Sequence, residues 1–311
     1  MSLYSSSINE IEKRMELNLP EDLKENTLHE YSDIQLVVRE FDLSSRPEEI
    51  EGRYPLRLKD SLLIVVLSGA VDIEMNYQSH VLESHMVVQL TEDDIILSIT
   101  HSVDFTGYLV LISSELRSEI KGMTAGVRLQ KAHRLKRAYP VQKLDDKEFS
   151  WVVGHIRNIQ SYILDKTHLY RSLLIRNEVI NLFLNLDNCR GKKHGDGEIE
   201  LSRAELLRER FRELIVGKCR EHRDVGYYAQ ELCVTPDYLS RVIREYDGGS
   251  AIKWIATAVV TEAKFLMRQP GKTINEIALE MNFPDQSTFG KFFKKHTGMS
   301  PKEYKTESLF S

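Results

Sequence analysis

Two short segments of this 311-residue chain carry side chains that could bind the edges of base pairs. Arg241 can donate two hydrogen bonds to one guanine, and Lys291 can bind either a guanine or a backbone phosphate. The polar residues around them are spaced for the outer face of a short helix. The candidate contact residues are Asp237, Tyr238, Ser240, Arg241, Arg244, Gln286, Ser287, Thr288, Lys291 and Lys295. Any one of them alone is more simply a solvated side chain, so the hypothesis depends on the two sets being related.

An internal repeat relates the two sets. Residues 228–232 match residues 277–281 at an offset of 49, and the offset becomes 50 after the turn that follows. At that offset, the aligned pairs are Leu239 with Phe289, Arg241 with Lys291, Ile243 with Phe293, Arg244 with Lys294, and Trp254 with Tyr304. Self-similarity at a fixed period indicates two copies of one supersecondary unit.

Each copy carries the signals of two short helices around a tight turn. Thr235 and Asp285 are placed as N-caps of the second helices, and Pro236 occupies a first helical position, where its missing N–H costs nothing. Gly248 and Gly298 are placed as C-terminal stops. Each copy is therefore predicted to be a helix-turn-helix, a motif that presents its second helix to the major groove.

Residues 203–306 resemble the DNA-binding domain of AraC-type transcription regulators. The residues that carry the match are Ala229, Leu232, Tyr238 to Arg241, Glu262 to Lys264, Ile277, Ala278, Phe283, Phe289, Phe293 to Lys295, and Gly298 to Tyr304. The resemblance implies two units joined rigidly by a helix over 250–268, with double-stranded DNA as partner. The base-facing positions that it implies are Asp237, Ser240, Arg241, Ser287, Thr288 and Lys291. Asp237 has a second interpretation, which we slightly favour: its carboxylate stabilises the N-terminus of its own helix.

Four residues depart from the pattern of that family. Asn282 stands where glycine is usual, Val259 where arginine is common, and Lys305 replaces a common arginine. Gly290 replaces a common polar residue on the second recognition helix. We therefore expect that helix to make one base contact fewer than its counterpart.

The first half of the chain shows a different periodicity. Apolar residues alternate in runs at 34–41, 62–67, 71–77, 85–90, 95–100 and 105–112, which predicts short antiparallel strands in a barrel or sandwich. In AraC-like regulators this position holds a cupin-like jelly roll, and residues 30–115 resemble one. The expected fold class is thus α+β with two domains: a cupin-like antiparallel β barrel with a helical dimerisation hairpin, then an all-α domain with two helix-turn-helix units.

Helical periodicity returns at Asp145, where Asp145 and Glu148 have the spacing of an N-terminal cap pair. Two apolar helices are expected up to residue 186, with more apolar surface than one hairpin can bury. They are therefore the predicted homodimer interface, with Ile163 and Phe183 as outward positions. Residues 187–201, with three glycines, are the predicted linker, which gives domains of 1–186 and 202–311.

Composition sets further limits. Lys and Arg outnumber Asp and Glu by 18 to 15 in residues 203–311, whereas the remainder has 24 against 32, so the positive excess lies with the repeat. There is no apolar run of membrane-spanning length and no signal-peptide pattern, so we expect a cytoplasmic protein without membrane contact. The three cysteines lack metal-type spacing, and Cys233 is expected to be a small buried apolar residue.

The histidines of the expected barrel do not form a metal-site pattern. His80, His85 and His101 lack the HxH pair followed by Glu and His that a cupin metal site usually shows. We therefore predict no metal, no cofactor and no enzymatic activity. The main hypothesis is a dimeric regulator with a small-molecule effector in the barrel and RNA polymerase as a further partner. Two alternatives stay open: a regulator whose barrel binds no small molecule, and a cupin-type enzyme with an interaction domain.

Overall fold

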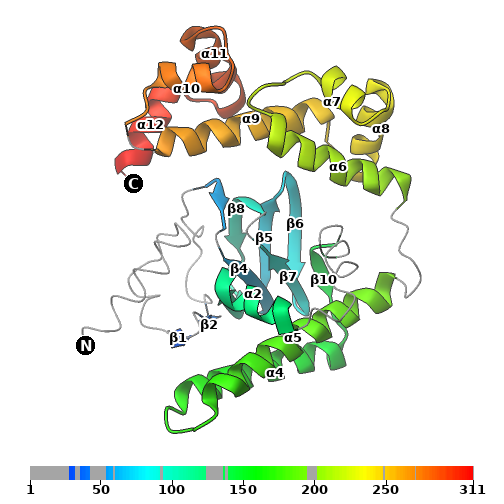
Figure 1. Ribbon diagram of the computed structural model, residues 1–311, viewed down its shortest axis with the longest axis vertical. Coiled ribbons are helices and arrows are strands. Elements are labelled where there is room, and N and C mark those ends of the chain that lie inside the picture. Colours follow the sequence, from blue (N-terminus) through cyan, green and yellow to red (C-terminus); the bar gives the residue numbers. More distant parts are fainter. Residues whose placement is uncertain are drawn as a thin grey trace. The chain divides into compact units, whose positions relative to one another are not determined.

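The computed structural model describes residues 28–31, 36–42, 54–58, 60–91, 94–123, 136, 139–194, 202–247, 249–269 and 271–310. The chain divides into two compact units, Met1–Ile199 and Glu200–Ser311. Figure 1 shows strands and helices in the first unit and helices in the second. No helix in the described ranges is both long and apolar enough to cross a membrane.

Within the described residues, the first unit contains two antiparallel sheets and a layer of helices. The six-stranded sheet runs in the order β1 (Leu28–Tyr31), β2 (Leu36–Asp42), β9 (Thr106–Ile112), β4 (Ser61–Ser68), β7 (Met86–Leu90) and β10 (Val141–Lys143). The four-stranded sheet runs in the order β3 (Leu56–Arg57), β8 (Ile95–His101), β5 (Ala70–Met75) and β6 (Gln78–Glu83). The prediction of short antiparallel strands is confirmed, while a closed, cupin-like barrel stays a prediction.

Strand β6 was missed because its sequence, QSHVLE, buries only Leu82 and therefore lacks a strong alternating pattern. The expected strand over 71–77 ends at Met75 instead. Asn76 and Tyr77 both have positive φ, 50° and 69°, and form the two-residue turn between β5 and β6. Two positive φ values in such a turn match the right-handed twist of the flanking strands.

One apolar core lies between the two sheets. Side chains of the six-stranded sheet such as Ile64, Val88 and Leu111 belong to the same buried cluster as Ile73 and Ile99 of the four-stranded sheet. Alternate residues of the six-stranded sheet point to its opposite face, since successive side chains of a strand alternate between faces. That sheet is therefore buried on both sides, which explains the continuous burial of β4.

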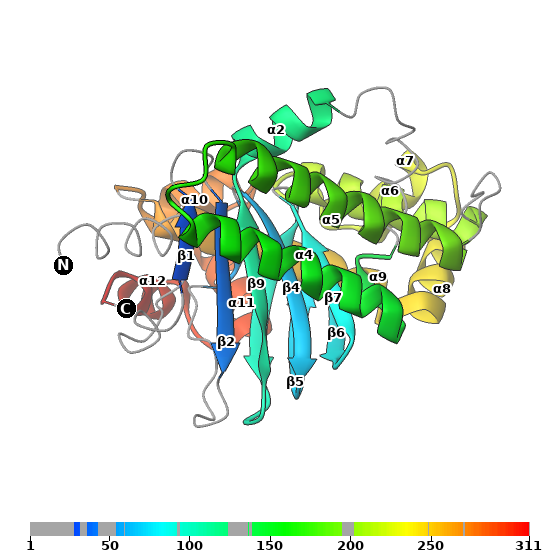
Figure 2. The same cartoon turned by 90° about the horizontal axis from the view of Figure 1, so that it is seen from below.

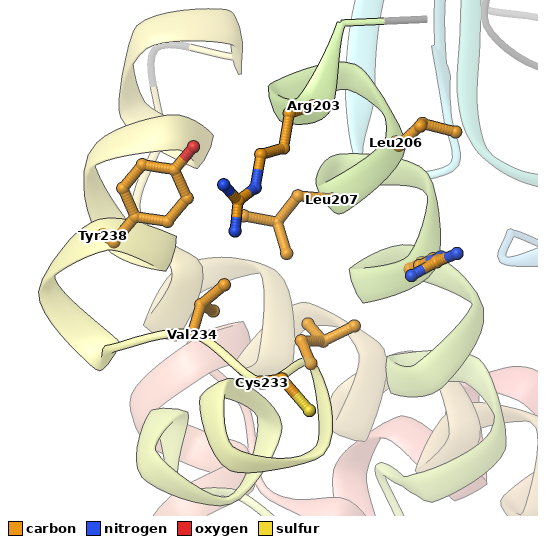
Figure 3. A pocket seen from close by; sticks show the side chains of 8 residues that line it. Arg203, Leu206, Leu207, Cys233, Val234 and Tyr238 are labelled. Carbon is orange, nitrogen blue, oxygen red and sulfur yellow. The ribbon is translucent and has the colours of Figure 1, made fainter.

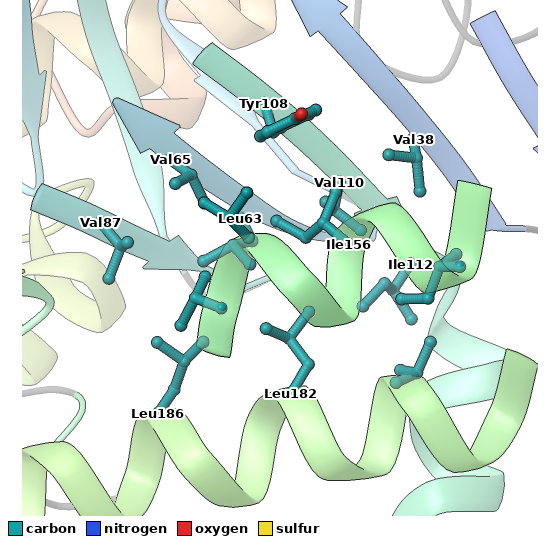
Figure 4. Packing of buried hydrophobic residues seen from close by; sticks show 14 of the residues in the cluster. Val38, Leu63, Val65, Val87, Tyr108, Val110, Ile112, Ile156, Leu182 and Leu186 are labelled. Carbon is teal, nitrogen blue, oxygen red and sulfur yellow. The ribbon is translucent and has the colours of Figure 1, made fainter. Parts of the chain in front are cut away.

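A second core joins the other face of the six-stranded sheet to a helical layer. Helices α2 (Ser114–Met123), α4 (Asp146–Leu164) and α5 (Arg171–His194) cover this face, as Figure 2 shows for α4. Ile156 of α4 and Leu182 of α5 lie with Val65 and Val110 of the sheet in one cluster (Figure 4). The capping box of Asp145 and Glu148 begins α4 as predicted.

Two sequence predictions about these helices are wrong. Residues 187–194 are not linker, because α5 continues to His194. Arg190 holds this last part of the helix in place: its side chain is fully buried, bonds Asp187 at 2.9 Å and donates to the Tyr139 carbonyl at 3.2 Å. Ile163 is not an outward position either, since it is 4% exposed in the helix–sheet core. Phe183 is partly buried against the same core.

The second unit consists of helices within the described residues. They are α6 (Arg203–Lys218), α7 (Val225–Glu231), α8 (Pro236–Asp247), α9 (Ala251–Arg268), α10 (Ile274–Glu280), α11 (Gln286–Thr297) and α12 (Pro301–Phe310). Helix α9 is buried along most of its length and packs against helices from both repeat copies. It therefore forms the shared centre of the unit.

Candidate nucleic-acid interface

Helices α7 and α8 form the first helix-turn-helix. Asp224 caps α7, and the Thr235 hydroxyl accepts a hydrogen bond from the Tyr238 backbone N–H at 3.2 Å at the start of α8. The predicted cap at Thr235 is thus confirmed. The turn between the helices passes through Cys233, whose φ of 56° lies in the left-handed region. This side chain is exposed, so the prediction that Cys233 is buried is wrong, because the turn directs it away from the core.

Helices α10 and α11 form the second helix-turn-helix. Thr273 and Glu276 make a capping box at α10, and Asp285 caps α11 as predicted. Asn282 takes the place of Cys233 in this copy and has nearly the same φ, 54°. Asparagine tolerates this conformation better than most residues, which explains how it replaces the usual glycine. Gly298 ends α11 in the left-handed region as predicted, whereas Gly248 lies outside the described residues.

The two copies have matching aromatic cores. Phe211 of α6 stacks on Trp254 at 6.0 Å between ring centroids and meets Tyr228 edge-on at 5.6 Å. In the second copy, Phe293 contacts Tyr304 at 5.8 Å. Trp254 and Tyr304 are equivalent in the repeat. Each therefore anchors one copy, and burial of these rings contributes strongly to the stability of both.

Helix α8 presents a polar face opposite its buried face. Leu239, Val242 and Ile243 are buried, and at 100° per residue the opposite side falls on Asp237, Arg241 and Arg244, which are all exposed. Ser240 lies at one margin of this face. Tyr238 lies at the other, half-buried and directed towards α6 (Figure 3). The first copy thus brings two arginines and one carboxylate together on its outer surface.

Helix α11 presents a corresponding face opposite buried Phe289 and Phe293. Ser287, Lys291 and Lys295 are exposed on it. Gln286 is also exposed, but it lies seven residues before Phe293 and so projects on the Phe293 side of the helix. Thr288 is exposed too, but its hydroxyl and its backbone N–H both bond the carboxylate of Asp285. Its side chain therefore serves the helix cap in this structure.

Sequence reasoning left one residue of this face out of the candidate set. Lys294 is exposed and lies between the directions of Ser287 and Gly290 on the helix. The signal was available, since Lys294 aligns with Arg244 in the repeat. A Cβ added at Gly290 would meet open space, so the missing polar contact leaves a gap on this face.

Two ionisable groups at the ends of α11, Asp285 and His296, have shifted pKa values, and these shifts decide which groups carry the positive charge of this helix. Hydrogen bonds from the backbone and side chain of Thr288 lower the pKa of Asp285, which keeps this cap ionised. Burial lowers the pKa of His296, with a smaller contribution from Lys295, so the imidazole is neutral at pH 7. The positive charge of this face at neutral pH therefore comes from lysine.

The loop between α6 and α7 ties the two copies together. Arg220 bonds Glu262 of α9 at 2.5 Å and Glu280 of α10 at 2.8 Å. Arg223 donates to the backbone carbonyls of Met281 and Asn282 in the turn of the second copy. The two recognition helices are thus positioned by this loop as well as by α9. Sequence reasoning missed both arginines, which carry no local pattern.

The three histidines considered for a metal site, His80, His85 and His101, occupy different elements. His80 is in β6, His101 ends β8, and His85 is in the turn before β7, 4.2 Å from the Phe149 ring. Across the described part of the chain, no group of three or more His, Cys, Asp or Glu side chains is arranged to hold a metal ion.

The two linked helix-turn-helix units agree with the known proteins and the domain family that this sequence matches. The family described as "Helix-turn-helix domain" matches residues 228–307. The arabinose operon regulatory protein of Salmonella typhimurium is 33% identical over 84 residues, covering 27% of this chain and 30% of that protein. Its Escherichia coli counterpart is 33% identical over 82 residues, covering 26% and 28%. The chain thus matches less than a third of the length of these relatives.

Solved structures cover the chain to different extents. The C-terminal domain of AraT from Geobacillus stearothermophilus is 30% identical, covering 35% of this chain and 88% of that one with a TM-score of 0.32. ToxT from Vibrio cholerae, bound to an unsaturated fatty acid, is 16% identical, covering 87% and 94% with a TM-score of 0.42. The second unit of our protein contains a helix-turn-helix domain of the AraC type.

Proposed function

We propose that this protein is a transcription regulator that binds double-stranded DNA in a sequence-specific way, with α8 and α11 in the major groove. The observation that carries the proposal is the pair of outward polar faces on these two helices, held on the common helix α9. Because each face carries cations at equivalent repeat positions, one subunit would read two sub-sites about one helical turn, roughly 10 bp, apart.

Some of the candidate residues would contact bases, and others would contact backbone phosphates. Arg241 lies near the middle of the outward face of α8, where a guanidinium can bind guanine with two hydrogen bonds. Lys291 is its repeat equivalent, while Arg244 and Lys294 lie about one turn further along and suit phosphates. Tyr238 is the weakest candidate for a base contact, since its ring is directed towards α6.

The test is selection of bound sequences from a random duplex pool with the full-length protein. We expect enrichment of a motif with two sub-sites and affinity that falls steeply with salt, because phosphate contacts release counterions. Arg241→Ala should change the enriched motif. Lys302→Ala, which removes an exposed cation of α12 outside both recognition helices, should leave it unchanged. A folded protein that enriches no motif at low salt would contradict the proposal.

Homodimerisation is the second part of the proposal. Trp151 of α4 is 39% exposed, and Leu173 and Leu184 of α5 are 56% and 37% exposed. They lie on the sides of α4 and α5 opposite the residues buried in the helix–sheet core. Apolar surface of this kind suits contact with a second copy better than contact with water.

The first unit is proposed to make DNA binding respond to a signal. Its separate core allows it to change without unfolding the helix-turn-helix domain. The space between the sheets is occupied by apolar side chains such as Ile73, Val88 and Leu111. An effector between the sheets would therefore be apolar. In the alternative form of the proposal, this unit holds only the dimer together.

A further inference from the structure

A pocket of about 280 Å³ lies in the second unit, between α6 and the turn that joins α7 to α8 (Figure 3). Helix α6 supplies Arg203, Leu206, Leu207 and Arg210 to its wall. These residues have i, i+3, i+4 and i+7 spacing, so they form one continuous stripe of the helix. None of them belongs to the outward faces of α8 and α11.

The opposite wall carries no charged side chain. It is formed by Leu232, Cys233 and Val234 of the turn and by the ring of Tyr238. The left-handed φ of Cys233 turns the chain here and leaves its sulfur exposed (Figure 3). With Leu206 40% exposed on the other side, the pocket offers water an apolar floor that the domain itself does not cover.

The charge at this pocket is of one sign. Arg203 and Arg210 are exposed and lie about 10 Å apart along α6, at 1.5 Å per residue. Of the other arginines of α6, Arg208 and Arg212 both pair with Glu209, at 3.8 and 2.7 Å. No acidic residue lines the pocket. Two cations therefore bracket an apolar floor, with no carboxylate of the pocket to balance them.

We propose that this pocket is a docking site for an acidic amphipathic helix of a partner protein. A volume of about 280 Å³ holds one or two large apolar side chains, which would act as the buried anchors of such a contact. Carboxylates one turn before and one turn after these anchors on the same helix would reach Arg203 and Arg210. In recognition of this type, an amphipathic helix places apolar side chains at positions i, i+3 and i+4 into a groove of its partner.

The apolar lining argues for a helix over nucleic acid. A phosphate backbone would use the two arginines but has nothing to place against Leu206, Leu207 and Val234. Because the site lies outside the outward face of α8, its occupation does not depend on the DNA-binding role proposed above. Tyr238 borders both regions, so a docked helix would lie directly beside the DNA-reading surface.

The test uses full-length protein without DNA and a fluorescein-labelled helical peptide with Glu, Leu, Phe and Glu at positions i, i+3, i+4 and i+7. Fluorescence anisotropy should show binding that weakens at least tenfold in Arg210→Glu and in Leu206→Ala. Lys302→Glu makes the same charge change on exposed α12 and should have no such effect. The peptide should also slow alkylation of Cys233 by iodoacetamide, which locates it in the pocket.

Several results would overturn the proposal. One is failure of this peptide to bind at low salt, and another is equal binding of a scrambled peptide with the same composition. A third is unchanged alkylation of Cys233 at saturating peptide. If Arg210→Glu left peptide binding intact but weakened binding to random duplex DNA, the arginine would be a phosphate contact. Circular dichroism of each variant shows that a loss of binding is not a loss of fold.

Discussion

The guanidinium of Arg223 lies over the ring of Phe283, with its central carbon 3.7 Å from the ring centroid. Arg223 belongs to the loop before the first helix-turn-helix, and Phe283 follows the turn of the second. The stacking adds to hydrogen bonds from Arg223 to the carbonyl of Asn282 at 3.2 Å and to that of Met281. One side chain therefore ties the two DNA-reading units to each other.

Removing this contact should loosen the spacing between the two sub-sites that one subunit reads. For the wild type, inserting half a helical turn between them should lower affinity at least tenfold more than inserting a full turn. In Arg223→Ala this difference should shrink. Arg223→Lys keeps the charge but loses the planar guanidinium group, so its difference between the two insertions should lie between those of the wild type and of Arg223→Ala. Arg212→Ala, outside the contact, is the control. An unchanged insertion profile in Arg223→Ala would show that α9 and the Arg220 contacts set the spacing without Arg223.

The two recognition helices should contribute unequally to base reading. Arg241→Ala is expected to cost about 1–3 kcal/mol at the target site and to relax preference at one base pair. Lys291→Ala should weaken binding with a smaller loss of preference, because Gly290 leaves α11 with one polar side chain fewer. Footprinting and affinity measurements on single-base variants of the site compare them. The opposite ranking would make α11 the principal reader.

Gly290 offers a test of how closely α11 approaches DNA. Its missing side chain faces open space in the free protein, so Gly290→Ala should stabilise the second unit by about 0.5–1 kcal/mol. DNA affinity should stay unchanged if only side chains of α11 reach the groove. Gly154→Ala, a helix glycine of the first unit that also faces open space, controls for stability alone. Loss of DNA binding in Gly290→Ala would show that the backbone of α11 meets the DNA.

Lys136 should make the stability of the first unit depend on pH. Burial lowers its pKa from 10.5 to about 8, despite the opposing effect of Asp94. The folded protein then binds this proton more weakly than the unfolded chain does. The free energy of unfolding should therefore rise with pH between about 8 and 10.5 and be lowest below pH 8.

Substitution of Lys136 tests that sign. Lys136→Met should raise the free energy of unfolding at pH 7 by on the order of 1–3 kcal/mol and flatten its rise above pH 8. Lys136→Arg keeps a charge that does not titrate in this range, so it should flatten the rise without stabilising the protein. Urea unfolding followed by circular dichroism from pH 6 to 10 gives both quantities. A destabilised Lys136→Met variant at pH 7 would show that the attraction of Lys136 to Asp94 and Asp187 outweighs the cost of its burial.

The dimer is expected to depend on the outer side of α5. Leu184→Glu places a carboxylate on the proposed interface and should shift full-length protein from dimer to monomer at micromolar concentration. Ser79→Glu introduces the same charge on exposed β6 of the four-stranded sheet and should leave the dimer intact. Sedimentation velocity separates the two states. A dimer that survives both Leu184→Glu and Leu173→Glu would require another interface.

Helix ends could be predicted from the sequence, because they depend on residues that are close together in the chain. The N-caps at Thr235 and Asp285 and the left-handed stop at Gly298 each depend on one side chain and the next few backbone groups. The repeat added a comparison within the chain, which identified both helix-turn-helix units and paired Arg241 with Lys291. The strands with strong apolar alternation could also be predicted, because the alternation is a pattern of neighbouring residues.

Tertiary packing decided the rest. Periodicity shows that α4 has an apolar stripe, but the sheet determines that Ile163 is covered while Trp151 stays exposed. Residues 187–194 look like a linker because of their glycine and charges, yet Arg190 finds partners from distant segments that keep them helical. The contact of Arg223 with Phe283 joins residues 60 positions apart, and no local pattern encodes it. Such pairings exist only once the chain has folded, because their free energy comes from groups that the sequence does not place together.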